Sequence, residues 1–288
     1  MHRQLHIFLT AVFLILTPLR FTQAAELTAR DAVSLDGTEI AYVEGGSGAV
    51  TIVFVHGWTC DKSYWAEQLP VFAEKYRVIA VDLAGHGDSG LGRANYSMQG
   101  FGADVVAAVG DEGQVVLVGH SMGGPVILQA ALLLGDRVEG LVAVDTLRDV
   151  SPPITSEEQI RAQVAPLEQD YDAVAGQFLA SMFLENSDPE LQRKITADML
   201  ATDRVVGVDA VRGMMQSDTG AALDALTAPL VLINSTYRPT NLTAVAAHHP
   251  DTQLELMEGV GHFVMMEDPD TFNSLLSNAI LSFLAENP

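Results

Sequence analysis

The residues GHSMG at positions 119–123 contain the strongest candidate for a nucleophile in this chain. A run typical of a buried strand, QVVLV, precedes them, and a helical segment rich in small residues follows. Glycines at both ends of the motif permit a sharp strand-to-helix turn, where side chains would collide with neighbouring backbone. Such a turn holds the Ser121 hydroxyl clear of the sheet at a helix N-terminus, which favours developing negative charge. The pattern indicates nucleophilic catalysis, and the alternative is a serine that only caps the helix.

A serine nucleophile needs a general base, and His262 is the best placed histidine. It lies in GVGHFVMMEDP (259–269), between the last predicted strand and the last predicted helix. Gly259 and Gly261 indicate a loop at a strand's carboxyl end, where ligands collect in open α/β sheets. We therefore expect His262 to face the nucleophile as its base. The alternative is a surface histidine without a catalytic role.

Acyl chemistry also requires donors for an oxyanion, and HGW (56–58) follows a predicted buried strand. The backbone N–H groups of Trp58 and Met122 are predicted to bind the oxyanion. Gly57 permits the close backbone approach that this requires. The side chain of His56 is expected to be satisfied by local hydrogen bonds.

Other reactive residue types are predicted to be structural. His86 lies in DLAGHGDSG (82–90), whose glycines and aspartates indicate a tight turn. Cys60 is the only cysteine, which excludes an intramolecular disulfide and is more typical of a packed thiol than of a nucleophile. The sequence has neither a metal-ligand cluster nor a phosphate-binding glycine loop, so we expect no metal and no cofactor.

The elements that position these residues are strands alternating with helices. A hairpin is predicted around Asp36-Gly37, before this alternation begins. The alternation predicts right-handed crossovers and a mostly parallel central sheet flanked by helices. The buried-strand patterns lie at 51–56, 77–82, 114–119, 138–145, 229–234 and 252–257.

A long interruption of the strand pattern predicts an inserted helical cap. Residues 148–226 contain only amphipathic helical patterns. This length is too small for an independent catalytic domain but sufficient to roof a pocket. The core is then expected to comprise residues 25–147 and 227–288.

The N-terminus is predicted to be a signal peptide, residues 1–24. Weakly basic MHRQ precedes an apolar run, and small residues at Thr22 and Ala24 offer a cleavage site. An uncleaved anchor is the alternative. Cleavage implies export, to the periplasm or outside the cell.

Charge limits the classes of partner. The formal net charge is −22, from 15 Lys and Arg against 37 Asp and Glu. Such a chain repels nucleic acid and anionic membrane surfaces. We expect a small-molecule substrate, no nucleic-acid partner and no membrane association after signal cleavage. The sequence has no signal for an oligomeric state.

Four motifs together resemble the α/β-hydrolase superfamily, in its serine esterase, lipase and peroxidase-like branch with a helical cap. HGW, DLAGHGDSG, GHSMGG and GVGHFVMMEDP occur in that family's order. The resemblance runs from about Leu27 to the C-terminus and is poor in the cap, which in this family sets the substrate. Members that open epoxides or remove halide usually have aspartate where this chain has Ser121, so the resemblance implies acyl transfer to water instead.

The resemblance also exposes a departure, because most members take the triad acid from the turn after VLIN (231–234). That turn holds no Asp or Glu, and Arg238 occupies the expected place. Some members take the acid from the strand after the elbow helix, which here ends in Asp145. We therefore predict that Asp145 orients His262, with Asp149 in reserve; a capping role at the entry to the cap is the alternative. The turn itself is expected to lie beside His262 and to line the pocket.

The predicted function is cleavage of small or medium carboxylic esters through a Ser121, His262 and Asp145 triad and an acyl-enzyme intermediate. Two alternatives are a lactonase, amidase or carbon–carbon hydrolase with the same triad, and a non-catalytic ligand-binding protein with this fold. The substrate pocket is expected to be apolar and to include Trp58, Phe263, Phe178 and Met182.

Overall fold

The computed structural model describes residues 26–111 and 113–286. The predicted signal peptide, residues 1–24, lies outside this part of the chain. Within it, no helix combines the length and apolar character needed to span a bilayer.

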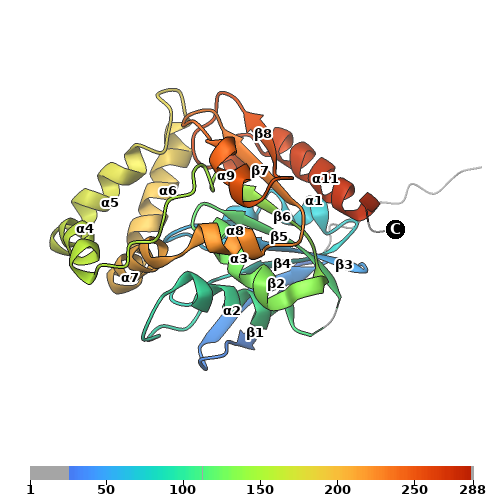
Figure 1. Cartoon of the computed structure of the whole chain (residues 1–288), viewed down its shortest axis with the longest axis horizontal. Helices are drawn as coiled ribbons and strands as arrows, with labels where there is room; N and C mark the ends of the chain where they lie inside the picture. Colours follow the sequence, from blue (N-terminus) through green and yellow to red (C-terminus); the bar gives the residue numbers. More distant parts are fainter. Residues whose placement is uncertain (1–25, 112, 287–288) are drawn as a thin grey trace, which may run out of the picture.

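An eight-stranded sheet forms the centre of the fold, in the order β1-β2-β4-β3-β5-β6-β7-β8 (Figure 1). The first two strands form the predicted hairpin, and β2 is also antiparallel to β4; all other neighbours are parallel. The structure confirms every predicted strand to within one residue at each end. The strands are β1 (Thr28–Val33), β2 (Glu39–Gly45), β3 (Val50–Val55), β4 (Arg77–Val81), β5 (Gln114–His120), β6 (Val138–Val144), β7 (Leu230–Ser235) and β8 (Gln253–Met257).

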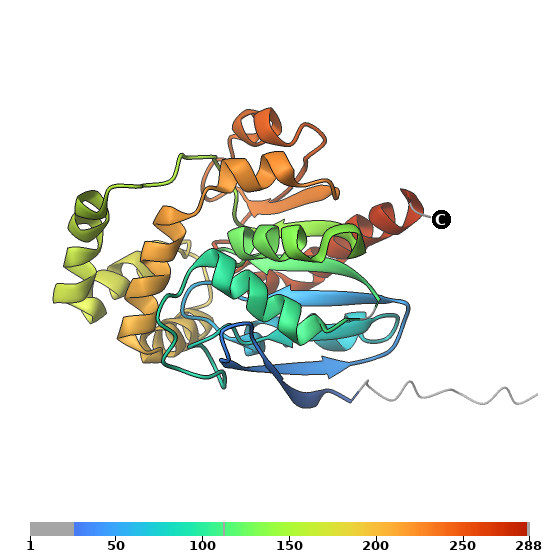
Figure 2. The same cartoon turned by 60° about the horizontal axis from the view of Figure 1, so that its bottom comes forward.

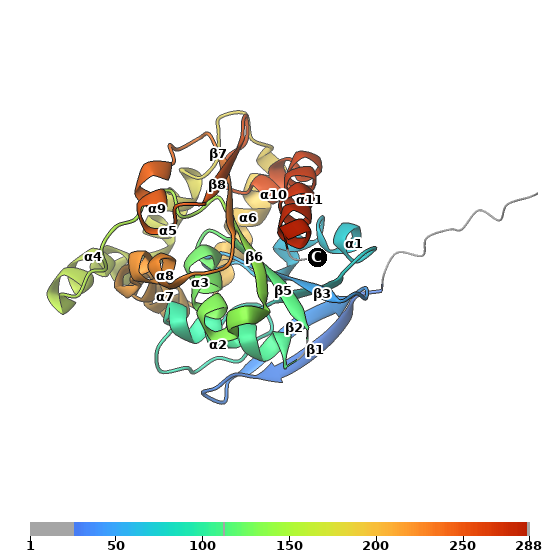
Figure 3. The ribbon, with the colours of Figure 1, turned by 45° about the vertical axis from the view of Figure 1, so that its right-hand side comes forward.

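Continuous burial explains why the central strands read as unbroken apolar runs. Ile52, Val53, Phe54 and Val55 of β3 are all fully buried, because helices cover both faces of the sheet. Figure 3 shows the two helical layers on opposite sides of the strands. One layer contains α2 (Met98–Val109), α3 (Gly123–Leu134), α8 (Thr219–Ala225) and α9 (Leu242–His248); the other contains η1 (Lys62–Trp65), α1 (Leu69–Phe72), α10 (Val264–Glu267) and α11 (Pro269–Glu286).

Four further helices between β6 and β7 extend to one side of the sheet (Figure 2). They are α4 (Glu157–Gln169), α5 (Tyr171–Ala180), α6 (Pro189–Ala201) and α7 (Arg204–Gln216), and they are called the insertion helices below. Each starts at a residue whose side-chain oxygen accepts a backbone N–H of the first turn, which fixes its N-terminus. These N-cap residues are Ser156, Asp170, Asp188 and Asp203.

Trp58 and Thr59, directly after β3, join the insertion helices to the sheet. The indole N–H of Trp58 donates to the Gly207 carbonyl at 2.8 Å, and its ring lies edge-on to Phe178 at 6.0 Å. The Thr202 hydroxyl donates to the Thr59 carbonyl at 2.9 Å. The element that ends in the HGW motif therefore also fixes the position of the insertion helices.

A pair of glycine substitutions tests the packing of β6 on α11. A Cβ on Gly140 would lie 2.4 Å from the Phe283 ring, whereas one on Gly176, within α5, would meet no atom within 4 Å. We expect Gly140→Ala to lower the free energy of unfolding by about 1–3 kcal/mol through overpacking. Gly176→Ala should raise it by about 0.5–1 kcal/mol because alanine is the better helix former. Urea unfolding followed by circular dichroism measures both, and equal effects would contradict the packing argument.

Candidate active site

Ser121 lies on a tight turn between β5 and α3. Its φ of 53° falls in the left-handed region that residues other than glycine rarely adopt. A Cβ on Gly119 would lie 2.3 Å from the Gly123 carbonyl oxygen, and one on Gly123 would lie 2.6 Å from that of Val55. The two motif glycines are therefore required by close backbone packing, and Ser121 lies at the carboxyl end of a central strand.

His262 and Asp145 meet at this same end of the sheet. The Nδ1 atom of His262 lies 2.6 Å from Oδ2 of Asp145, although 117 residues separate them in sequence. Asp145 directly follows β6, its side chain is fully buried, and its φ is 48°. The backbone N–H of His262 donates to the Met182 carbonyl at 2.8 Å. With Nδ1 bonded to the carboxylate, Nε2 is the ring nitrogen left for a further partner.

The second oxygen of Asp145 accepts three donors, two of which come from Ser235, the last residue of β7. The backbone N–H and the hydroxyl of Ser235 lie 2.7 and 2.8 Å from Oδ1, and the Arg148 guanidinium also donates to it. Burial alone would raise the pKa of Asp145. The hydrogen bond to His262, the charges of His262 and Arg148 and the Ser235 N–H outweigh it and hold that pKa below its ordinary value.

The reserve candidate, Asp149, is exposed and does not contact His262. Its carboxylate accepts the Val150 backbone N–H at 2.9 Å and the Asn241 side chain at 3.3 Å. Asp145 is therefore the acidic side chain that the structure brings to His262.

The turn after β7 differs in part from expectation. Tyr237 has its ring 6.2 Å from that of His262, so the turn does lie beside the histidine. The expectation that it lines the pocket is wrong, because no residue from Asn234 to Pro239 borders the cavity next to Ser121. The side chain of Asn234 instead bonds both the N–H and the carbonyl of Thr146, so the turn is held against the end of β6.

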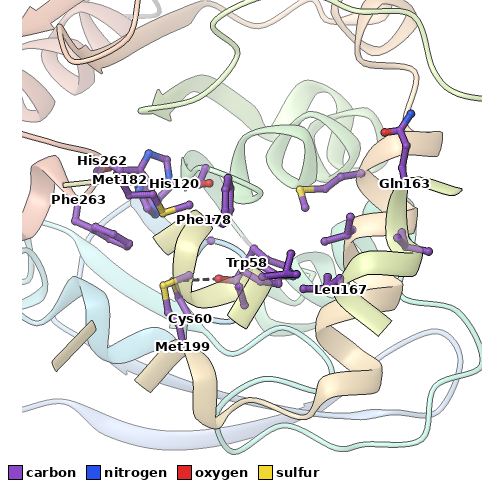
Figure 4. Close-up of a pocket in the computed structure, with 17 residues that line it drawn as sticks. Trp58, Cys60, His120, Gln163, Leu167, Phe178, Met182, Met199, His262 and Phe263 are labelled. Atoms are coloured by element: carbon purple, nitrogen blue, oxygen red, sulfur yellow. Dashed lines mark hydrogen bonds between the residues drawn. The ribbon is translucent and has the colours of Figure 1, made fainter. Parts of the chain in front are cut away.

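A cavity of about 320 Å³ lies between the sheet and the insertion helices. Figure 4 shows His262 and His120 at one end and Gln163, on α4, at the opposite end. The four residues expected in the pocket, Trp58, Phe178, Met182 and Phe263, all line it, as does Ser121. The predicted base His262 lines it too. Most of the remaining lining is apolar and was not predicted: Gly57, Cys60, His120, Gln163, Val164, Leu167, Val174, Ala175, Met199, Val211 and Met214.

Of the two residues whose backbone N–H groups are expected to bind an oxyanion, Trp58 lines the cavity and Met122 directly follows Ser121, which also lines it. The N–H groups of Trp58 and Met122 take part in none of the turn and loop hydrogen bonds found in residues 26–111 and 113–286. Cys60 also lines the cavity, but burial raises the pKa of its thiol, which donates to the Trp58 carbonyl at 3.4 Å. A protonated, hydrogen-bonded thiol is a weak nucleophile.

Three histidines near the site are buried and have structural hydrogen bonds. His56 accepts the Leu83 N–H at 3.0 Å and bonds the Gly57 carbonyl at 2.8 Å, while His86 bonds the Ala84 carbonyl at 3.0 Å. His120 bonds the His262 carbonyl at 3.0 Å, so it fixes the loop that carries that residue. Among the described residues no group of His, Cys, Asp and Glu is arranged to hold a metal ion.

Two residues of the site, Arg148 and Ser235, were missed by sequence reasoning. Arg148 follows Asp145 by three positions, and a cation so close to a candidate acid was a usable signal. Ser235 lies in the stretch expected beside His262, but the sequence assigned it no role of its own. Its role as a hydrogen-bond donor to an acid on another strand depends on the pairing of β6 with β7.

The chain belongs to the alpha/beta hydrolase family, whose model matches residues 52–275. It is 29% identical over 262 residues to a dihydrolipoyllysine-residue acetyltransferase component of an acetoin cleaving system from Cupriavidus necator. That match covers 84% of this chain but only 66% of the longer relative.

Other relatives match over nearly their whole length. A pimeloyl-[acyl-carrier protein] methyl ester esterase from Yersinia pseudotuberculosis is 26% identical over 84% of this chain and 96% of its own. The solved structure of a thermophilic esterase from Thermogutta terrifontis has a TM-score of 0.77 at 24% identity, with 89% of this chain and 99% of that one covered. The match to the Thermogutta structure shows that the two chains share a fold.

The buried histidines predict a loss of stability in acid. Burial lowers the pKa of His56 to about 4 and those of His86 and His120 to about 3, whereas the unfolded chain binds these protons near 6.5. The stability they contribute is therefore complete above about pH 6.5 and falls as the pH drops, by roughly 1–2 kcal/mol per histidine at pH 5. Urea unfolding between pH 5 and 7.5 measures this slope, and His86→Gln should make it shallower. An unchanged slope in that variant would show that His86 does not contribute.

Proposed function

We propose that the protein is a serine hydrolase that cleaves small or medium, uncharged carboxylic esters through an acyl-enzyme intermediate. The observation that carries the proposal is the 2.6 Å contact between His262 and Asp145, because His262 lines the same cavity as Ser121. The Yersinia relative, named as a methyl ester esterase, supports ester cleavage as the reaction.

In the proposed reaction, the Ser121 oxygen attacks the acyl carbon while Nε2 of His262 accepts its proton. Asp145 holds the imidazole in the required tautomer and stabilises the imidazolium. The Trp58 and Met122 amides donate to the oxyanion. Collapse of the tetrahedral intermediate breaks the bond to the alcohol, which leaves with the proton from His262. Water then attacks the acyl-enzyme by the same steps, releasing the acid and regenerating Ser121.

The character of the cavity supports an uncharged and largely apolar substrate. No Lys, Arg, Asp or Glu side chain of the described residues lines it, so a charged substrate group would be buried there without a partner among them. The strongly negative net charge also repels anionic substrates at a distance. Gln163, at the end opposite His262, is the polar side chain best placed to meet a neutral polar group remote from the ester.

A fluorophosphonate probe tests whether Ser121 is an activated nucleophile. We expect stoichiometric modification of Ser121 in the folded protein, located by mass spectrometry, and none in Ser121→Ala. The same variant should lose activity on short p-nitrophenyl esters. A folded protein that is neither labelled nor active would instead support a ligand-binding role. Product analysis on ester, lactone and amide panels then defines the bond cleaved.

Two acid substitutions test which carboxylate serves His262. Asp145→Asn should lower kcat by about 10⁴-fold, because the amide favours the wrong imidazole tautomer. Asp149→Asn is the matched control, since Asp149 follows the same strand but is exposed and does not touch His262, and it should change kcat less than about threefold. A large loss in the control and a small one in Asp145→Asn would reverse the assignment.

A further inference from the structure

Arg148 has an unusually complete set of partners around the carboxylate of Asp145. Its Nη2 donates to Oδ1 of Asp145, to the Ser235 carbonyl at 3.1 Å and to the Ser235 hydroxyl at 3.0 Å. Its Nη1 donates to the carbonyls of Ser235 and Arg238 and to the Thr240 hydroxyl. The side chain is only 16% exposed. One guanidinium thus bonds both the candidate acid and the turn where the family usually has its acid.

The contacts divide the two carboxylate oxygens between two functions. Oδ2 of Asp145 meets His262, and Oδ1 is held by Arg148 and Ser235. The three donors on Oδ1 fix the plane of the Asp145 carboxylate. They therefore determine the direction in which Oδ2 points. A planar guanidinium with several N–H groups provides that constraint better than a single ammonium would.

Arg148 is the arginine that forms an ion pair with the buried carboxylate of Asp145. The other charged side chains near this ion pair have different partners. His262 itself is faced by Asp145 from β6, His120 from β5 and Tyr237 from the turn after β7. Glu267, the last residue of α10, accepts the N–H groups of Gly261 and Phe263 on either side of His262.

The Arg238 guanidinium lies over the Tyr237 ring at 5.2 Å and donates to the Ser181 hydroxyl, so it is directed away from Asp145. The Arg148 guanidinium lies over the Tyr237 ring at 5.1 Å, and this contact helps to hold it beside Asp145.

We propose that Arg148 is a positioning residue that fixes the Asp145 carboxylate on His262, with Ser235 as its partner. This inference rests on the proposed function. The end of β7 and the turn after it hold no acid but supply Ser235 and the carbonyl and hydroxyl acceptors of Arg148, so they support an acid that follows the neighbouring strand. The carboxylate that directly follows β6 and the arginine three residues later thereby form one functional unit.

Two substitutions of Arg148 separate the effect of its planar guanidinium, with several N–H donors, from the effect of its charge. Arg148→Met should lower kcat on a p-nitrophenyl ester by about 10- to 100-fold with KM within about twofold, since only the orientation of the triad changes. Arg148→Lys keeps the charge but loses the fork, and should recover part of that loss. The low-field proton NMR signal of the His262 Nδ1 hydrogen bond should shift or broaden in Arg148→Met and less so in Arg148→Lys.

Arg77→Met is the matched control. Arg77 also pairs with a carboxylate, Glu44, and is 31% exposed, but it begins β4 at the end of the sheet opposite the site. The Arg77→Met substitution removes the same charge as Arg148→Met and should leave kcat and the NMR signal unchanged. If Arg148→Met does not fold, Arg148→Lys decides by the same two measurements.

Wild-type kcat together with an unchanged Nδ1 signal in Arg148→Met would overturn the proposal, as would a loss that appears only in KM. The NMR signal does not require turnover, so it tests the Arg148 contact even if the protein proves inactive. Failure of the parent protein to react with fluorophosphonate would instead contradict the proposed function alone.

Discussion

The hydrogen bond between His262 and Asp145 is the contact on which the proposed chemistry depends, and it is possible only because of strand order. Parallel pairing of β5, β6, β7 and β8 brings the carboxyl ends of these strands to one edge. The ends of these strands and the loops after them then bring Ser121, Asp145, Ser235 and His262 to the same place, although the segments are distant in sequence. A slip of β6 by one residue would turn Asp145 away from the histidine.

Several residues at the carboxyl ends of the central strands have unfavourable backbone conformations. Thr59, Ser121, Asp145 and Leu147 are the residues other than glycine with positive φ in the described part of the chain, and all four lie at or beside the site. Such conformations cost free energy and persist where surrounding contacts hold them. The rest of the sheet is buried in apolar contact and provides that support.

Much of the fold could be predicted from sequence because burial on both faces leaves a simple signal. Runs such as VTIVFV and VEGLVAV lack the spacing of amphipathic helices and therefore predict buried strands. Their alternation with helical segments predicts a mostly parallel sheet. The position of Asp145 followed from the same logic, since it ends a strand beside the elbow. The spacing of Arg148 from Asp145 gave a signal for their pairing, but the bonds of Arg148 to the end of β7 and the cavity-lining role of Gln163 could not be predicted, because they depend on loop paths and on how the insertion helices pack.

The segment that leads from β6 to the insertion helices is held in place at its start. This has a consequence for changes in the cavity lining. The Arg148 carbonyl accepts the Asn241 N–H at 2.6 Å, so the chain leaves β6 already bound to the turn after β7. From there to Ser156, where α4 begins, the chain follows a connecting segment with few bonds to the site. A change in α4 that alters the cavity lining therefore need not disturb the contacts that hold Asp145. The base is tied more closely to the insertion, because the N–H of His262 donates to the Met182 carbonyl between α5 and α6.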